Sequence, residues 1–87
     1  MKKVETTKRF KKNFRSRISS NPRLVQKLQI RLDLLVVGNK ESIADHALHG
    51  DKLGLRAFSL TGDIRVIYRE TDQSFELIDI GTHNQVY

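Results

Sequence analysis

The chain has 87 residues, of which 38% are apolar and 30% charged, with a net charge of +6. These values suit one small, well-solvated domain with a single core. Cysteine is absent, which excludes disulfides and cysteine-based zinc or thiol chemistry. No apolar stretch approaches the roughly 18 residues of a membrane span, and no signal-peptide apolar region follows the basic start. We therefore expect a single domain over residues 1–87, cytoplasmic and with no membrane partner.

Positive charge is concentrated in the N-terminal quarter of the chain. Residues 1–23 carry nine basic side chains against one acidic residue, Glu5, whereas residues 24–87 have a net charge of −2. Such a block is typical of proteins that hold a polyanion, most simply a nucleic acid. An acidic protein partner fits the same block, and an ordinary solvated helix face is the alternative interpretation.

The first forty residues predict a helical hairpin. Residues 2–6 form an edge strand or an extended start, and Thr7 is a candidate N-cap for a helix with an aromatic stripe at a spacing of four. Asn21 and Pro22 then begin a second helix, which ends near Gly38. The apolar stripes comprise Phe10, Phe14 and Ile18 in the first helix and Leu24, Val25, Leu28, Leu32 and Leu35 in the second.

The second half of the chain predicts a small sheet. Residues 40–52 read as a connecting segment, with one helical turn near residues 41–44. Strands follow over residues 53–60, 64–69 and 75–80, and their short connections favour antiparallel hairpins. The predicted fold is α+β, with an N-terminal helical hairpin packed on one face of a small twisted antiparallel β-sheet.

The last seven residues place two proton-handling side chains four positions apart. His83 and Tyr87 follow an apolar strand directly. Imidazole is the side chain whose unperturbed pKa lies nearest neutrality, and a phenol orients or donates a proton, so the pair suits acid–base chemistry or phosphate handling. A frayed, solvated tail is the alternative.

Other polar residues complete a set that metal-free RNA cleavage requires. That reaction needs a base for the 2′-hydroxyl, an acid for the leaving 5′-oxygen and a cation for the phosphorane. Asp63 precedes the middle strand, Arg65 lies two residues further on, and His83 follows the adjacent strand. Each has a simpler explanation: Asp63 suits a turn, and Arg65 suits solvent or a cross-strand pair with Glu76 or Asp79.

No cofactor site is evident in the sequence. His46 and His49 are three residues apart, but no third ligand stands at a recognisable spacing, so a metal is not favoured, and His46 also suits local capping. The chain has no phosphate-cradling glycine loop and no serine nucleophile motif. We expect neither a metal nor a small-molecule cofactor.

Four segments carry a family resemblance. They are Asp45–Gly50, Leu53–Arg56, Asp63–Tyr68 and Gly81–Tyr87. In this order the segments resemble the RelE/ParE-like bacterial toxins, closest to the YafQ branch, over most of residues 43–87. The resemblance implies the toxin of a type II toxin–antitoxin system, which enters the ribosomal A site and cleaves mRNA there. Its implied partners are a cognate antitoxin and the ribosome.

The resemblance also implies site residues. Histidines stand at the branch positions of His46 and His83, an aspartate at that of Asp63 and an aromatic residue at that of Tyr87, while Arg65 matches a transition-state arginine of RelE-type members. His83 is then the general acid, either Asp63 or His46 the base, Arg65 the phosphate ligand, and Tyr87 the group that orients the phosphate or stacks on a base. The implied RNA- and ribosome-binding residues are Lys8, Lys11, Lys12, Arg15, Arg56 and Ser59.

Two departures keep rival functions open. Ser59 stands where the YafQ branch usually has a second histidine, and Ile64 replaces the usual tryptophan after the turn aspartate. The rivals are a ParE-like toxin that inhibits DNA gyrase by binding, and a catalytically weakened RNA-binding relative. ParE-like members generally lack the pair formed here by His83 and Tyr87, so the tail favours the nuclease.

Overall fold

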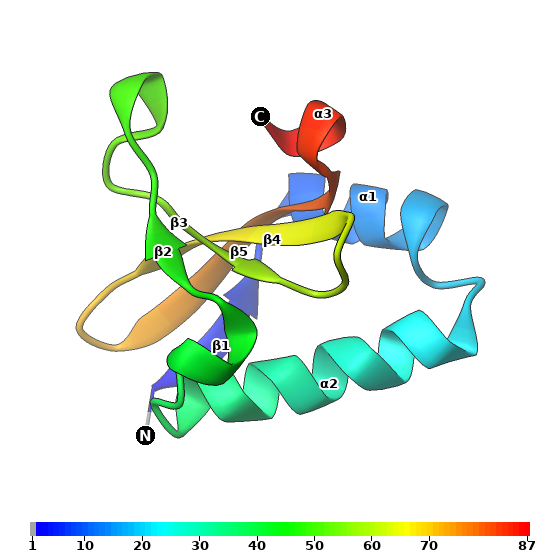
Figure 1. The fold of residues 1–87 in the computed structure, drawn as a ribbon, viewed down its shortest axis with the longest axis horizontal. Helices are drawn as coiled ribbons and strands as arrows, with labels where there is room; N and C mark the ends of the chain where they lie inside the picture. Colours follow the sequence, from blue (N-terminus) through cyan, green and yellow to red (C-terminus); the bar gives the residue numbers. More distant parts are fainter. Residues whose placement is uncertain (1) are drawn as a thin grey trace.

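A computed structural model of the protein describes residues 2–87 and shows helices packed on a five-stranded sheet (Figure 1). The elements in chain order are β1 (Lys3–Thr6), α1 (Lys8–Arg17), α2 (Pro22–Val36), the 3₁₀ turn η1 (Glu41–Ile43), β2 (His46–Ala47), the 3₁₀ turn η2 (Gly50–Lys52), β3 (Arg56–Ser59), β4 (Ile64–Glu70), β5 (Ser74–Thr82) and α3 (His83–Val86).

Local signals set the ends of both long helices. The Thr7 side chain caps α1 by accepting a hydrogen bond from the Phe10 N–H at 3.1 Å. Asn21 caps α2 in the same way, and Pro22 occupies its first turn, where a missing N–H costs nothing. After α2 the chain turns at Gly38, whose φ of +86° favours a residue without a Cβ. Both predicted helices are confirmed.

The sheet is larger than predicted and is mixed. Its strand order is β1-β5-β4-β3-β2, and β1 runs parallel to β5 while the other pairs are antiparallel. Backbone bonds from Lys3 N–H to the Gln73 carbonyl (3.0 Å) and from Thr7 N–H to the Leu77 carbonyl (3.1 Å) attach β1. The short strand β2 lies within the segment that the sequence marked as a connection. The predicted α+β arrangement is confirmed, but the sheet is not wholly antiparallel.

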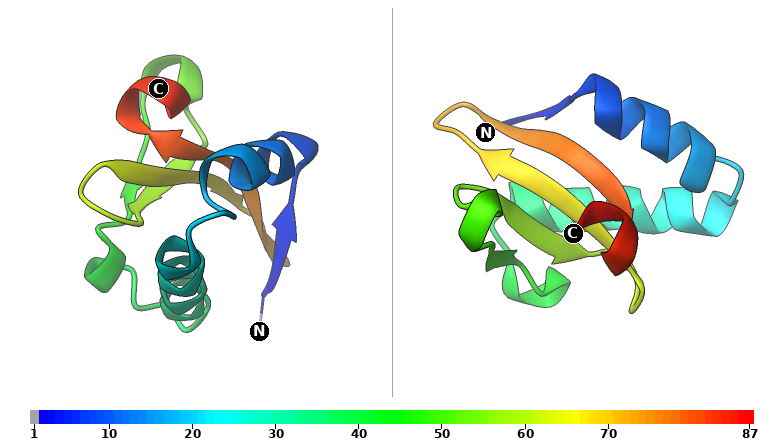
Figure 2. Two further views of the ribbon diagram at one scale, coloured as in Figure 1. Left: turned by 90° about the vertical axis from the view of Figure 1, so that its right-hand side faces the viewer. Right: turned by 90° about the horizontal axis from the view of Figure 1, so that it is seen from above.

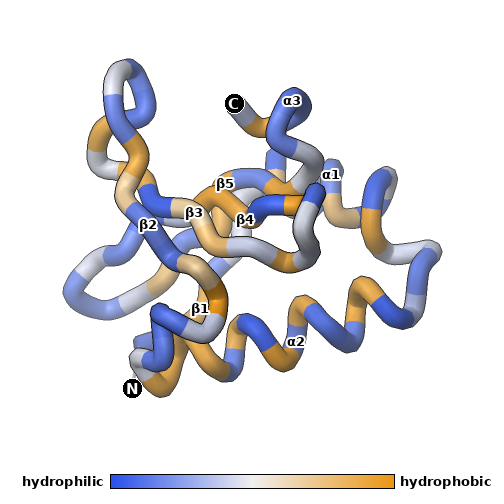
Figure 3. Tube along the Cα trace, viewed as in Figure 1, coloured by the Kyte–Doolittle hydropathy of each residue, from blue (hydrophilic) through white to orange (hydrophobic). Residues whose placement is uncertain are grey.

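The main core lies between the helical hairpin and one face of the sheet (Figure 2). Its largest fully buried side chains include Tyr68 and Phe58 from the sheet and Leu35 from α2. Apolar positions recur along α2 and along the central strands (Figure 3), as the helical spacing predicts. Val25, predicted as part of this stripe, instead keeps 36% of its surface exposed.

A bulge in β5 decides which of its side chains enter this core. Ile67 faces Asp79 whereas the next residue, Tyr68, faces Leu77, so Ile78 is an extra residue in β5. Leu77 and Ile80 therefore both point into the main core although they are three residues apart. A regular strand would send them to opposite faces.

A second apolar cluster forms on the opposite face of the sheet. It comprises Leu48, Ala57, Ile67 and Val86, with Leu55 and Ile78 packed against it. Val86 is only 5% exposed, so α3 is held against the sheet and is not a frayed tail. The left view of Figure 2 shows α3 and the β2–β3 connection on the side of the sheet opposite α2. This second face carries the candidate site.

Among residues 2–87, no helix is both long enough and apolar enough to span a bilayer.

Candidate functional site

The strand register aligns the candidate residues on the open face of the sheet. Ser59 pairs with Arg65, which in turn pairs with Gly81. One row further along, His46 pairs with Ala57, which belongs to the second apolar cluster. Since directly paired residues project from the same face of a sheet, the side chains of His46, Ser59 and Arg65 share the face that α3 partly covers.

A polar hollow of about 410 Å³ lies at the end of this face, lined by Gly62, Asp63, Arg65, Thr82, His83 and Asn84. The turn before β4 supplies the carboxylate, β4 the guanidinium and α3 the imidazole. An acid–base group and a fixed cation beside a carboxylate form the kind of site that binds and cleaves a phosphodiester. The structure thus brings together three of the predicted catalytic residues, Asp63, Arg65 and His83.

His83 is positioned by its place at the start of α3. Just before it, the Thr82 N–H donates to the Gln85 side-chain oxygen at 2.8 Å, which stabilises the first turn. The ring of His83 lies edge-on to the ring of Tyr87, with centroids 4.4 Å apart and an interplanar angle of 82°. The side-chain pair noted in the sequence is therefore a contact within one ordered turn.

Arg65 is held by the hairpin that precedes it. Its Nη1 donates to the carbonyl oxygens of Thr61 and Gly62, each at 3.0 Å. It does not neutralise Glu76 or Asp79, because Glu76 lies 3.9 Å from Arg69 and Asp79 lies 3.7 Å from Arg17. Arg65 therefore keeps its charge for a ligand while its backbone partners fix its position.

His46 and Tyr87 line a second hollow of about 370 Å³ on the same face, together with Ala47, Leu48, His49, Asp51 and Lys52. Tyr87 joins the two hollows, because it lines this one and touches His83, which lines the other. His49 and Lys52 were not predicted as site residues. Only the antiparallel pairing of β2 with β3 brings their connection beside the chain end.

The Tyr87 hydroxyl is held in its protonated form. Burial raises its pKa above the ordinary value, and the charge of Arg65 opposes that rise without overcoming it. The Tyr87 O–H is therefore available as a hydrogen-bond donor over the working range of an acid–base site.

We expect ultraviolet titration to detect this shift. The chain has two tyrosines and no tryptophan, and the pKa of Tyr68 is also raised, by burial and by its bond to Asp45. Less than half of the tyrosine should be ionised at pH 10, the ordinary midpoint. In Tyr68→Phe the remaining signal reports Tyr87 alone, and a midpoint at or below 10 would contradict the assignment. The denatured chain, titrating near 10, is the control.

Arg56, which the sequence analysis expected to contact RNA, projects from the helix side of the sheet and not from the open face. It pairs in register with Tyr68, whose side chain lies in the main core on the helix side. Its Nη2 lies 2.5 Å from Asp45 Oδ2, and this carboxylate side chain is only 1% exposed. Alternation along β3 therefore sends Arg56 and Ser59 to opposite faces.

Two residues of α1 that the sequence did not single out support the chain end. Arg17 Nη1 donates to the Ile80 carbonyl at 2.8 Å, and Asn13 Nδ2 donates to Asp79 Oδ1 at 2.6 Å. Between these bonds and α3, Gly81 is tightly enclosed: a Cβ there would come within 2.6 Å of both Arg17 and the Gln85 side chain. Arg17 thus faces inward, although in the sequence it is one more residue of the basic block.

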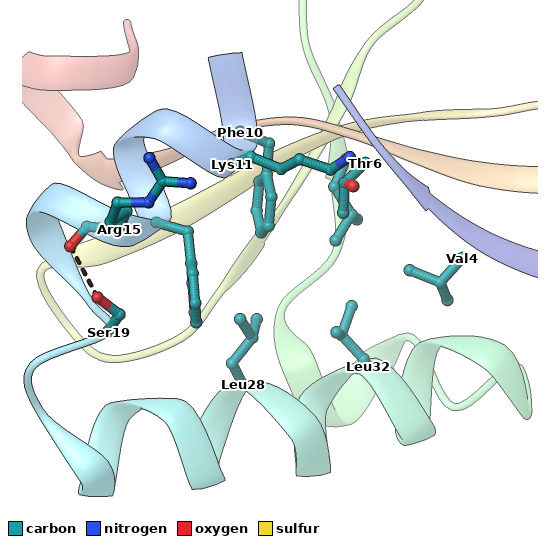
Figure 4. Close-up of a pocket in the computed structure, with 10 residues that line it drawn as sticks. Val4, Thr6, Phe10, Lys11, Arg15, Ser19, Leu28 and Leu32 are labelled. Atoms are coloured by element: carbon teal, nitrogen blue, oxygen red, sulfur yellow. Dashed lines mark hydrogen bonds between the residues drawn. The ribbon is translucent and has the colours of Figure 1, made fainter. Parts of the chain in front are cut away.

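Four other basic residues of α1 form an exposed stripe. Lys8, Lys11, Lys12 and Arg15 recur at three- and four-residue spacing and are all exposed. Lys11 and Arg15 also border an apolar groove of about 570 Å³ between α1, α2 and β1 (Figure 4). Apolar residues lining it include Val4, Phe10, Phe14, Leu28 and Leu32.

In the described part of the chain, residues 2–87, no three His, Cys, Asp or Glu side chains gather in a metal-binding arrangement. His46 lies in β2, and His49 immediately precedes η2, so the two histidines do not share a helical turn.

Comparisons with known proteins identify the family. A family model described as the bacterial toxin of type II toxin–antitoxin system, YafQ, matches residues 2–87. A search among curated protein sequences finds no match. Similar solved structures include YafQ of E. coli strain BL21(DE3), with 21% identity, a TM-score of 0.84 and coverage of 100% of this chain and 99% of that chain.

Two further structures share the fold. YafQ in the E. coli DinJ–YafQ complex has 22% identity and a TM-score of 0.82, with coverage of 100% of this chain and 99% of that one. The YoeB/ParE toxin from Agrobacterium tumefaciens has 20% identity and a TM-score of 0.80, with coverage of 93% and 98%. With a family model that spans the described chain, the protein belongs to the YafQ family of bacterial toxins of type II toxin–antitoxin systems.

Proposed function

We propose that this toxin is an endoribonuclease that enters the ribosomal A site and cleaves mRNA there by metal-free acid–base catalysis, which inhibits translation. The observation that carries the proposal is the polar hollow in which His83, Arg65 and Asp63 meet, with Tyr87 against the His83 ring. An imidazole, a guanidinium and a carboxylate around one space supply the groups that cleavage at a 2′-hydroxyl requires.

The reaction assigns one task to each group. The 2′-oxygen attacks the adjacent phosphorus after His46 or Asp63 takes its proton, and the bond from phosphorus to the 5′-oxygen breaks as His83 protonates that oxygen. Arg65 balances the charge of the phosphorane through charge-assisted hydrogen bonds, and Tyr87 orients the phosphate. The products are a 2′,3′-cyclic phosphate, or its 3′-phosphate after hydrolysis, and a 5′-hydroxyl.

The test is cleavage of mRNA on programmed ribosomes by the purified toxin, with and without EDTA. We expect codon-phased cuts with 5′-hydroxyl ends that persist in EDTA and are absent from free mRNA. Growth arrest with intact mRNA and broken DNA would overturn the proposal in favour of a ParE-like gyrase inhibitor. Absence of any arrest on expression would overturn it in favour of a non-toxic RNA-binding relative.

The exposed stripe of α1 is proposed to grip ribosomal RNA through its phosphates. Each such contact releases counterions, so affinity falls with salt. Lys12→Gln should reduce the slope of log affinity against log salt by about 1, whereas Lys27→Gln on α2 should leave it unchanged. Filter binding to ribosomes at several salt concentrations measures both slopes, and equal slopes for the two variants would contradict this role.

A cognate antitoxin is the proposed protein partner, as DinJ is for E. coli YafQ in the complex named above. The basic border of the apolar groove suits an acidic, amphipathic segment, and the outer edge of β1 offers unpaired backbone groups beside it. We expect an antitoxin encoded in an adjoining frame to bind the Lys11→Glu, Arg15→Glu variant at least about tenfold more weakly by calorimetry. Lys27→Glu is the control, and unchanged affinity would argue against this groove.

A further inference from the structure

A buried carboxylate immediately precedes His46 and is bonded to two other strands. The Asp45 side chain is 1% exposed. Arg56 of β3 donates to it from Nε, at 3.1 Å to Oδ2, and from Nη2, at 2.5 Å, and the Tyr68 hydroxyl of β4 donates to Oδ1. A buried charge persists only where it is paired and hydrogen-bonded. These three residues therefore form a rigid cross-link at the root of β2.

The bend beside this cross-link fixes the imidazole of His46. Ala44 has a φ of +54°, a left-handed conformation that a residue with a Cβ rarely adopts. Its carbonyl oxygen lies 3.1 Å from His46 Nδ1. Because a carbonyl only accepts hydrogen bonds, this contact favours the form of the ring with the proton on Nδ1, and in the neutral ring that form leaves the Nε2 lone pair free.

We propose that Asp45, Arg56 and Tyr68 act as a positioning network that holds the bend at Ala44. The bend lets His46 present an unprotonated Nε2 on the open face as the general base. This inference rests on the proposed function. Asp63, the other candidate base, lies exposed in the hairpin turn, and its hydrogen bond to Thr61 is made by its backbone N–H at 3.2 Å. Among residues 2–87, nothing comparable orients its carboxylate. None of the three network residues needs to touch RNA.

The network is distinguished from mere structural support by a double-mutant cycle with His46. Asp45→Asn and Tyr68→Phe are each made in the wild-type chain and in His46→Ala, and single-turnover cleavage is measured on saturating ribosomes. In the wild-type background we expect about a ten- to hundredfold loss in the rate constant with unchanged ribosome affinity, because small misplacements of a catalytic group cost that much. In His46→Ala the same changes should have no further effect.

Glu70→Gln is the matched control. Glu70 of β4 binds Lys40 at 2.7 Å, close to the same bend, and Lys2 at 2.6 Å, and these cations hold its pKa below the ordinary value. The substitution removes ion pairs near η1 but leaves the contacts of Asp45 and His46 intact. Cleavage by Glu70→Gln should therefore match the wild type. A loss equal to that of Tyr68→Phe would overturn the proposal.

Nitrogen NMR of His46 supplies a readout that does not depend on cleavage. At a pH where the ring is neutral, the wild type and Glu70→Gln should show the form protonated at Nδ1, and Asp45→Asn should show a mixture of both forms. If Asp45→Asn does not fold, Tyr68→Phe, which removes one hydrogen bond, carries the test. An unchanged tautomer in the folded variants, or equal losses of rate with and without His46, would overturn the network.

The two proposals fail in different ways. A wild-type toxin that cuts no mRNA on ribosomes removes the proposed function, while the NMR result still shows whether the network sets the ring. If the toxin cuts mRNA but neither Asp45→Asn nor Tyr68→Phe changes the His46 tautomer, the proposed function stands and the positioning network is contradicted.

Discussion

His83→Ala should lower the single-turnover rate of mRNA cleavage by about 10²- to 10⁴-fold, the usual contribution of a positioned acid or base. The imidazole lines the polar hollow with Arg65 and Asp63 and is held against Tyr87. In the proposed reaction, its removal leaves the departing 5′-oxygen without a proton donor. Because the fold and the basic stripe of α1 remain, ribosome affinity should be unchanged.

The matched control is Asn84→Ala. Asn84 is the next residue of α3, is exposed, and lines the same hollow, so the variant tests whether any truncation there disturbs the site. We expect it to cleave within a few-fold of the wild type. A His83→Ala toxin that cleaves as fast as Asn84→Ala would show that the acid lies elsewhere, and Tyr87→Phe would then be the next variant to measure.

Arg56→Ala should lower the free energy of unfolding by about 3–5 kcal/mol, because it leaves a buried carboxylate without its counter-ion. The Asp45 side chain is only 1% exposed, so solvent does not replace the lost partner. The pKa of Arg56 is raised by its hydrogen bonds to Asp45, despite the opposing effect of burial, which indicates a tight pair. Urea denaturation of the variant and the wild type measures the difference.

Arg69→Ala is the matched control for this prediction. Arg69 is also a β-strand arginine beside an acidic residue, but its Nη1 lies 3.9 Å from Glu76 and its side chain is 53% exposed. Exposed pairs of this kind contribute about 0–1 kcal/mol. Equal losses for the two variants would mean that Asp45 finds another partner. If Arg56→Ala instead weakened RNA binding with no loss of stability, Arg56 would be an RNA contact and not the counter-ion on which the fold depends.

Local patterns in the sequence were sufficient for the helical hairpin. The Thr7 and Asn21 caps, Pro22 and the stripes of Phe10 and Leu28 act within one or two turns, so their spacing determines the outcome. Strands β4 and β5 could be predicted equally well, because a short turn joins them into a hairpin. On the open face, residue types alone suggested the chain-end pair and the groups around the hairpin turn, whereas the remaining site residues were suggested by resemblance to a family.

The parts that sequence reasoning missed depend on contacts between distant residues. The parallel pairing of β1 with β5 joins Lys3 to Ser74, and no local pattern encodes a register over that separation. The bulge at Ile78 depends equally on the partner strand. The strand at His46 and Ala47 is too short to show an alternation of apolar and polar residues. It forms because its backbone pairs with β3.

The sequence by itself determined the two long helices, the central hairpin, the basic stripe of α1 and the chemistry available at the chain end. Tertiary structure alone decided which side chains meet. Arg56 and Arg65 look equivalent in sequence, but strand register sends one to the core side, against Asp45, and the other to the hollow with His83. The physical reason is that side chains alternate between the two faces of a strand. This alternation shows which residues share a face, but it does not show which face the helices will cover.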